Sequence, residues 1–175
     1  MSIRRLVPAE AATYRALMLE GYELHPDAFG SSAAERAALP LEWWEERLVP
    51  TAQPASLVLG AFEGEKLAGI VGLAFETREK TRHKALLFGM YVPARYRRLG
   101  LGRRLVLAAL DEARARPGLR LVQLTVSESN RAARTLYEQC GFVQFGLEPL
   151  AMAHGGELIA KVHMWCDLGD AIERP

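Results

Sequence analysis

Three apolar runs follow one another along the chain, with only short polar segments between them. They are Leu57–Phe62, Leu67–Phe75 and the run from Lys84 to Val92, and the turn 63–66 joins the first two into a hairpin. A strand that alternates apolar and polar residues covers one face of a sheet, whereas a strand that is apolar almost throughout is buried on both faces. The sequence therefore predicts a central sheet with helices on both of its faces.

Helical periodicity marks several of the segments around these strands. The helices expected are the stretch from Pro8 to Leu24, the stretch from Ser32 to Val49 that is interrupted at Pro40, Leu101–Ala115 and Arg131–Cys140. The further strands expected are Ile3–Val7, Leu119–Val126, Phe142–Gly146 and Leu158–Trp165, the last two separated by a loop at Gly155 and Gly156. The order is then β-α-α-β-β-β-α-β-α-β-β, which predicts a single mixed α/β domain over residues 1–175.

Charge and composition exclude several classes of protein. The 22 Lys and Arg against 21 Asp and Glu leave a net charge of +1, which argues against a protein whose main partner is nucleic acid. Cys140 and Cys166 are the two cysteines, and their spacing fits neither a disulfide framework nor a zinc site, so we expect no metal. No apolar run is long enough to span a bilayer, and no leader pattern is visible. We expect a soluble cytoplasmic protein.

The most informative segment lies between the third apolar run and the helix Leu101–Ala115. It contains five arginines, and no carboxylate occurs from Ala94 to Arg104. Gly100 and Gly102 stand where the loop enters the helix, so backbone N–H groups there can approach an anion closely. The lysine and hydroxyl residue of a P-loop are absent, and Leu105 occupies the position of the third glycine of a dinucleotide fingerprint. The pattern favours a diphosphate site of another kind.

Two motifs carry a family resemblance. The segment Val92–Arg104, centred on Arg97-x-x-Gly100-x-Gly102, resembles the acyl-CoA-binding motif of the GNAT superfamily of N-acetyltransferases. The later run from Asn130 to Phe142 resembles that family's second signature, Asn-x-x-Ala-x-x-Leu-Tyr-x-x-x-Gly-Phe. The resemblance implies a GNAT-like fold, with a mostly antiparallel twisted sheet of about seven strands that splays between strands 4 and 5. It also implies acetyl-CoA as cosubstrate.

The resemblance assigns residues to coenzyme binding. The diphosphate would lie on the backbone of the loop and helix start, formed by Arg97, Arg98, Leu99, Gly100, Leu101, Gly102 and Arg103. The pantetheine arm would pair with the preceding strand near Met90 and Val92, as an added strand at a gap in the sheet. We place the bulge that opens this gap at Gly89, which could equally be a packing glycine. Asn130 would cap the next helix and lie near the coenzyme.

The expected chemistry is direct transfer of an acetyl group to a primary amine, without a covalent acyl-enzyme. The resemblance points the Tyr137 hydroxyl at the thioester sulfur, where a protonated phenol can donate to the departing thiolate. The strand before the phosphate loop lacks the Glu or His that many relatives use as a base, since residues 85–88 are apolar. The remaining base candidates are Glu76, His83 and Glu128, each of which could also be a solvated surface residue.

The acceptor and the state of assembly are less visible in the sequence. The regions that form the acceptor pocket in relatives contain Tyr22, Glu23, His25, Asp27, Phe29, Trp43, Trp44 and Glu76. A small molecule, an amino acid and a peptide or protein amine all stay open as acceptors, as does an acyl group longer than acetyl. The alternatives to an enzyme are a non-catalytic acyl-CoA-binding module of the same fold and, more weakly, nucleic-acid contact through the arginine loop. No membrane partner is expected, and the resemblance makes a homodimer through the final strands plausible.

Overall fold

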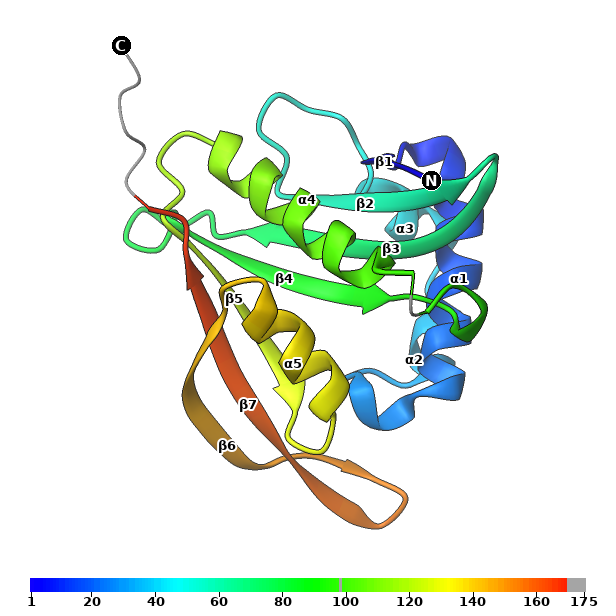
Figure 1. The fold of residues 1–175 in the computed structure, drawn as a ribbon. Coiled ribbons are helices and arrows are strands. Elements are labelled where there is room, and N and C mark those ends of the chain that lie inside the picture. The colour runs from blue at the N-terminus through cyan, green and yellow to red at the C-terminus, as the bar shows by residue number, and fades with distance from the viewer. Residues whose placement is uncertain (98, 170–175) are drawn as a thin grey trace.

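In the computed structural model, which describes residues 1–97 and 99–169, seven strands form one sheet in the order β1-β2-β3-β4-β5-β7-β6 (Figure 1). The strands are β1 (Ser2–Arg5), β2 (Ser56–Glu63), β3 (Lys66–Phe75), β4 (Lys84–Tyr91), β5 (Leu121–Ser127), β6 (Val143–His154) and β7 (Glu157–Asp167). Neighbouring strands are antiparallel except for the parallel pair β4 and β5. The predicted fold class, a mostly antiparallel sheet of about seven strands, is confirmed.

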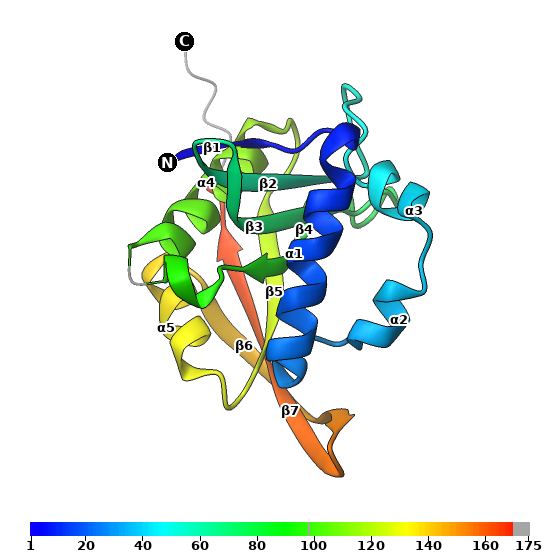
Figure 2. The same ribbon diagram turned by 90° about the vertical axis from the view of Figure 1, so that its right-hand side faces the viewer.

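Helices cover both faces of the sheet, as the apolar strands require. Figure 2 shows α1 (Ala11–Leu24), α2 (Ala33–Ala37) and α3 (Leu41–Glu46) on one face, and α4 (Leu101–Ala115) and α5 (Arg131–Gln139) on the other. Each face has its own buried apolar cluster, one under α1 and α3 and one under α4 and α5. Three short 3-10 turns complete the described chain: η1 (Pro8–Glu10), η2 (Pro26–Ala28) and η3 (Ala94–Tyr96).

The first helical face differs from the predicted element order in one respect. The interrupted stretch from Ser32 to Val49, which the order counted as one helix, is two short helices, α2 and α3, on either side of Pro40. Proline donates no backbone hydrogen bond and disfavours the helical conformation at the residue before it, so the chain cannot continue as one helix. The capping box predicted at Ser32 is present, with Ser32 and Glu35 accepting from each other's backbone N–H.

The closing hairpin differs from its prediction in length. β6 extends from Val143 to His154, well beyond the predicted strand Phe142–Gly146, and pairs with β7 up to the turn at Gly155 and Gly156. Register shifts interrupt this pairing, and Leu150 adopts a positive φ of 53°. β6 is an exposed edge strand, so burial imposes no regular apolar pattern from which its length could be read.

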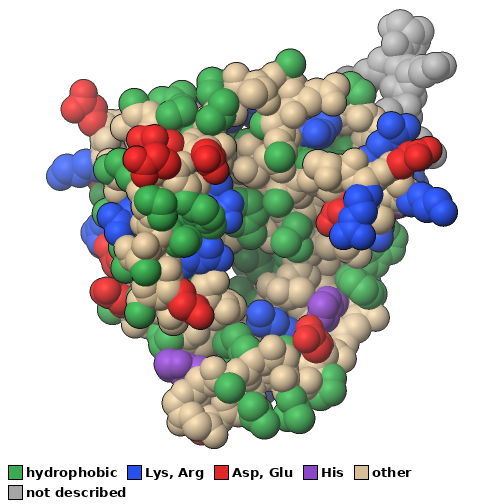
Figure 3. Space-filling view, turned by 180° about the vertical axis from the view of Figure 1, so that it is seen from behind, with side chains coloured by type: hydrophobic (Ala, Val, Ile, Leu, Met, Phe, Trp, Pro, Cys, Tyr) green, Lys and Arg blue, Asp and Glu red, His purple; other side chains and the backbone are tan. Residues whose placement is uncertain are grey.

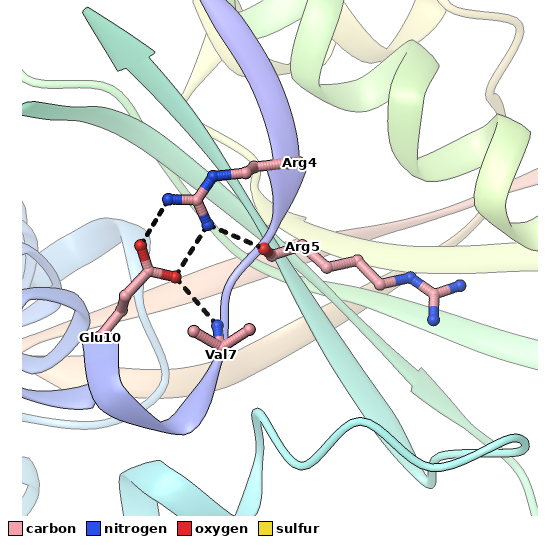
Figure 4. Close-up of polar contacts among 4 residues, drawn as sticks. All are labelled: Arg4, Arg5, Val7 and Glu10. Carbon is pink, nitrogen blue, oxygen red and sulfur yellow. Dashed lines mark hydrogen bonds and ion pairs between the residues drawn. The ribbon is translucent and has the colours of Figure 1, made fainter. Parts of the chain in front are cut away.

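Glu10 holds β1 against the start of α1. Figure 4 shows its carboxylate accepting hydrogen bonds from the Val7 backbone N–H at 3.0 Å and from both terminal nitrogens of Arg4, at 2.6 and 2.9 Å. The hydrogen bonds from Arg4 lower the pKa of Glu10. An exposed pair of this kind contributes on the order of 1 kcal/mol or less. Its effect is to fix the direction in which the chain leaves the edge strand.

Candidate functional site

The site lies where the two parallel strands of the sheet separate. β4 and β5 pair over three residues each, Lys84–Leu86 with Leu121–Gln123, and no pairing of the two strands continues beyond Leu86 and Gln123 in the described chain. Gly89 lies in β4 with a φ of 59°, and the pairing of β4 with β3 shifts register between Phe88 and Tyr91. The predicted splay and the predicted bulge at Gly89 are therefore confirmed. Such a bulge bends the strand away from its former neighbour.

A cleft of about 750 Å³ occupies the gap and continues to the start of α4. Residues from β4, β5, α5, η2 and the loop before α4 line it together. The predicted coenzyme residues among them are Met90, Val92, Arg97, Gly100, Leu101, Gly102, Arg103, Asn130 and Tyr137. The structure thus brings two sequence motifs, some 30 residues apart, to the walls of one cleft.

Gly100 begins α4 in a left-handed conformation, with φ 68° and ψ 8°. A side chain at this position would be strained, and the capping hydrogen bond that a Ser or Asp would supply is absent from the described part of the loop. The backbone N–H groups of Leu101, Gly102 and Arg103 find no acceptor among the described residues, and all three residues line the cleft. These donors, which have no acceptor among the described residues, therefore lie at the positive end of the helix dipole, in residues that line the cleft.

Arg97 is held in place by two hydrogen bonds at the mouth of the cleft. Its Nε donates to the Val92 carbonyl oxygen at 2.9 Å, and its Nη2 lies 2.7 Å from Nε2 of His25. Leu99 is 62% exposed and does not line the cleft, and Arg98 lies outside the described residues. Together with Arg103, Arg97 gives this end of the cleft a positive charge suited to a phosphate group.

Asn130 and Tyr137 come to the cleft from α5. Asn130 is the residue before the helix, and its side-chain oxygen accepts a hydrogen bond from the Ala133 N–H at 3.2 Å, as its predicted capping role requires. Tyr137 is 7% exposed, and its ring packs edge-on against Phe142. Burial raises the pKa of the Tyr137 phenol. No described residue hydrogen-bonds its hydroxyl, so that group is available to a ligand.

A family model matches well over half of the chain. The family model described as acetyltransferase (GNAT) family matches residues 18–142, which include both motifs and most of the cleft wall. The chain belongs to the GNAT acetyltransferase family. The family prediction made from the two motifs is thereby confirmed.

Two solved structures are similar to this chain over nearly its whole length. The crystal structure of a GNAT-family acetyltransferase from Streptococcus pneumoniae is 30% identical, covers 96% of this chain and 99% of its own, and superposes with a TM-score of 0.84. The structure of YncA from Salmonella typhimurium with its cofactor acetyl-CoA has a TM-score of 0.79 at 22% identity, over 100% of this chain and 98% of its own. That likeness concerns the fold.

A curated relative matches a shorter part of the GNAT domain. The mycothiol acetyltransferase of Streptosporangium roseum is 53% identical over 49 residues, which are 28% of this chain. The matched segment spans 14% of the length of that relative. This likeness is therefore local.

The three predicted base candidates are not part of the cleft lining. Glu76 is exposed and accepts a hydrogen bond from the Thr81 hydroxyl at 3.2 Å, in the loop between β3 and β4. His83 belongs to the same loop, where its carbonyl oxygen accepts from two backbone N–H groups of the segment leading into β5. Glu128 is exposed just after β5. None of the three lines the cleft.

The turn η2 and its flanking residues instead bring to the cleft side chains that the sequence placed only in a general acceptor region. His25, Asp27 and Phe29 all line the cleft. The turn is held there by the Ser127 hydroxyl, which donates to the Asp27 carbonyl oxygen across 100 residues of sequence. The loop sequence around Asp27 has no periodic pattern from which this hydrogen bond could be predicted. Asp27 is the carboxylate residue among those lining the cleft.

Tyr91 lines the cleft from the end of β4 and is tied to α1. Its hydroxyl donates to Glu20 Oε1 at 2.9 Å, and burial together with this hydrogen bond raises the pKa of Tyr91 to about 12. Its ring lies 3.0 Å from the point where a Cβ on Gly21 would stand, so α1 can approach β4 this closely only with glycine there. Tyr91 therefore fixes the wall between the cleft and the first helix.

Within the described ranges, no group of three or more His, Cys, Asp or Glu side chains is arranged to hold a metal ion. Across residues 1–97 and 99–169, no helix combines the length and the apolar character needed to cross a membrane. Cys140 and Cys166 are both buried with their thiol pKa raised by burial, so neither is an activated nucleophile.

Proposed function

We propose that this GNAT-family chain transfers an acetyl group from acetyl-CoA to a primary amine, by direct attack while both substrates are bound. The observation that carries the proposal is the cleft itself: the gap between two diverging parallel strands ends at three helix N–H groups with no acceptor among the described residues, beside an arginine held by two hydrogen bonds. A diphosphate satisfies the donors, and an extended pantetheine arm fills the gap. Residues 1–175 would act as one domain, because the described strands all belong to one sheet.

The residues present fit the coenzyme. The diphosphate would be held by the N–H groups of Leu101, Gly102 and Arg103, with Gly100 allowing close approach and Arg97 adding charge. The pantetheine amides would face the part of β4 near Met90 and Val92 that has lost its neighbour. Arg98 and Leu99 enter only through the resemblance, and Asn130 borders the cleft near the start of α5.

Acetyl-CoA supplies the thioester, and the chain supplies its surroundings. The amine nitrogen forms a bond to the acetyl carbon, the carbon–sulfur bond breaks, the thiolate takes up a proton and the amine gives one up. The Tyr137 hydroxyl is suited to donate the proton to sulfur, because burial keeps the phenol neutral. A backbone N–H of the strand can polarise the carbonyl oxygen.

The proton released by the amine needs an acceptor, because an alkyl ammonium with a pKa of about 10.4 is not nucleophilic at neutral pH. Among the residues lining the cleft, the structure offers Asp27 and His25. Arg97 donates to Nε2 of His25, so that nitrogen has no free lone pair while the contact exists. We therefore propose Asp27 as the proton acceptor in place of Glu76, His83 and Glu128.

Two measurements test this function. Calorimetry with acetyl-CoA reports binding, and release of free thiol across a panel of amines reports transfer. Binding together with turnover on at least one amine supports the enzyme. Tight binding with no turnover on any amine favours the non-catalytic module of the same fold. DNA binding that survives saturating coenzyme A would instead support nucleic-acid contact through the arginine loop.

The homodimer expected from the resemblance stays a prediction. The edge strand β6, where the pairing would form, exposes Val143, Phe145 and Leu147 to solvent. An unpaired edge carrying apolar side chains is suited to pairing with a second copy. Light scattering coupled to size exclusion gives the mass directly, and a monomer at all concentrations would contradict the prediction.

A further inference from the structure

Two arginines beside the cleft lie against one aromatic ring. The guanidinium carbon of Arg47 is 3.6 Å from the centroid of the Trp43 ring, and that of Arg36 is 4.8 Å from the same centroid. Arg36 belongs to α2, and Arg47 immediately follows α3. Stacking on a ring orients a planar guanidinium and leaves its N–H groups at the edge free to bind a ligand.

Neither guanidinium group is held in an ion pair within the described part of the chain. Among the described residues, no Asp or Glu forms an ion pair with Arg36 or Arg47. Nε of Arg36 is buried without an acceptor, and burial lowers the pKa of Arg47. The groups acting on them electrostatically are the phenols of Tyr14 and Tyr22 and, for Arg36, the exposed carboxylate of its neighbour Glu35. Partly buried cations without a counter-ion are costly unless an anion completes the site.

The pair is continuous with the acceptor end of the cleft. Arg47 lies 5.8 Å from the ring centroid of Phe88, which lines the cleft. Phe29, also in the lining, packs edge-on against Tyr22 at 4.9 Å, so one aromatic wall connects the cleft to Arg36. Figure 3 shows the face opposite α4 and α5, which is hollowed near its centre and bordered by hydrophobic, basic and acidic side chains.

We propose that the acceptor amine carries a carboxylate, and that Arg36 and Arg47 bind it. This inference rests on the proposed function and names its substrate class: small amino acids and related amino carboxylates, in preference to polyamines or neutral amines. The two ends of such a zwitterion match the two charges at this side of the cleft. The carboxylate faces the arginines, while the ammonium faces Asp27, which lines the cleft. Arginine is suited to this role because its fork binds both carboxylate oxygens.

The test compares matched ligands on protein saturated with coenzyme A. Each free amino acid is paired with its own carboxamide, which keeps the amine and side chain but removes the negative charge. Calorimetry across several pairs should show that the free acids bind at least about tenfold more tightly, the scale of a charge-assisted hydrogen bond. Equal binding of both members, or tighter binding of the amides, overturns the proposal.

Variants of the two arginines test whether these residues cause the preference for free acids over amides. Arg47→Gln and Arg36→Gln should each reduce the ratio of acid to amide affinity by about tenfold, and Arg47→Lys should retain part of it. Arg82→Gln, an exposed arginine in the loop between β3 and β4, makes the same change of charge away from the cleft and should leave the ratio unchanged. Thermal unfolding shows whether each variant is folded. Because the two arginines are replaced separately, the proposal can still be tested if one of the variants does not fold. A ratio that is the same in all variants contradicts the proposal.

Thiol release measured with the same pairs of acid and amide tests the carboxylate site separately from acetyl transfer. Turnover of acids and amides with equal kcat/KM would contradict the carboxylate site and leave acetyl transfer in place. Preferential binding of the acids, lost in the two glutamine variants but without any turnover, would contradict acetyl transfer and support anion binding by these arginines. Turnover that favours the acids and depends on Arg47 supports both.

Discussion

Nη2 of Arg97 lies 2.7 Å from Nε2 of His25, and this contact joins the loop before α4 to the turn after α1. An arginine side chain has donors only, so the Nε2 atom of His25 must accept, and the ring carries its proton on Nδ1. The same guanidinium donates through Nε to Val92. Arg97 is therefore held between β4 and η2, with its charge at the mouth of the cleft.

Replacing His25 by alanine should loosen this arrangement. We expect the Kd for coenzyme A to rise by about twofold to tenfold, the scale of one net hydrogen bond, with a larger rise for Arg97→Ala. Calorimetry measures both. His154→Ala is the matched control, because His154 lies at the exposed end of β6 and does not line the cleft. Equal affinities for the His25 and His154 variants would show that the contact does not position Arg97 for the coenzyme.

Tyr137→Phe removes the hydroxyl proposed to protonate the leaving thiolate. The ring and its packing against Phe142 remain, so the affinity for acetyl-CoA should be kept, while kcat should fall by about ten to a thousandfold. Steady-state kinetics on the best amine of the panel, together with calorimetry, separates the two effects. Unchanged kcat would remove Tyr137 from the mechanism.

Asp27→Asn removes the proposed proton acceptor and keeps the size of the side chain. Because only the neutral amine attacks, kcat/KM should fall by about a hundredfold at pH 7, and the loss should shrink as the pH approaches the pKa of the free amine. Asp111→Asn, on the exposed surface of α4, provides the control. If kcat/KM of the variant depends on pH in parallel with that of the native protein, Asp27 contributes to binding and does not accept the proton.

The Tyr91 hydroxyl predicts a dependence of stability on alkaline pH. The phenol has its pKa raised to about 12 in the folded chain, above its ordinary value near 10, because it is buried and donates to Glu20. A raised folded pKa gives stability that is complete below pH 10 and is lost as the pH rises from 10 to 12. The loss amounts to as much as roughly 2 to 3 kcal/mol.

Comparison with Tyr91→Phe isolates this effect. The native protein should exceed the variant in free energy of unfolding by about 1 kcal/mol at pH 7 to 9, the net contribution of the hydrogen bond to Glu20. The difference should then decrease between pH 10 and 12. Urea denaturation at each pH measures it, and a difference that grows with pH would have the wrong sign for this account.

Much of the fold could be predicted because burial constrains it strongly. β2, β3 and β4 are apolar on both faces, so their existence and the helices covering them follow from the sequence. The glycines at 89 and 100 mark positions that adopt positive φ, at the bulge and at the start of α4. These features predicted the coenzyme end of the cleft.

The acceptor end was not predictable in the same way. The position of η2 depends on the contact between Ser127 and Asp27, and no local pattern reports a hydrogen bond across 100 residues. No sequence pattern distinguishes Arg36 and Arg47 from other charged residues, and it is the fold that brings both against Trp43. Glu76, His83 and Glu128 were predicted as base candidates because they are ionisable and lie next to expected strands. Nearness in the sequence does not determine whether a residue lines the cleft, and none of the three does.

The coenzyme cradle at the start of α4 is tested most directly by titrating acetyl-CoA into Gly100→Glu and Gly118→Glu. Both glycines have positive φ, 68° and 78°, and a Cβ at either would meet no atom within 4 Å, so both substitutions impose a similar backbone strain and add the same charge. Gly100 lines the cleft, whereas Gly118 lies beyond the far end of α4 and does not. The account predicts that calorimetry detects binding to the native protein and to Gly118→Glu but none to Gly100→Glu. Native affinity in Gly100→Glu would contradict it.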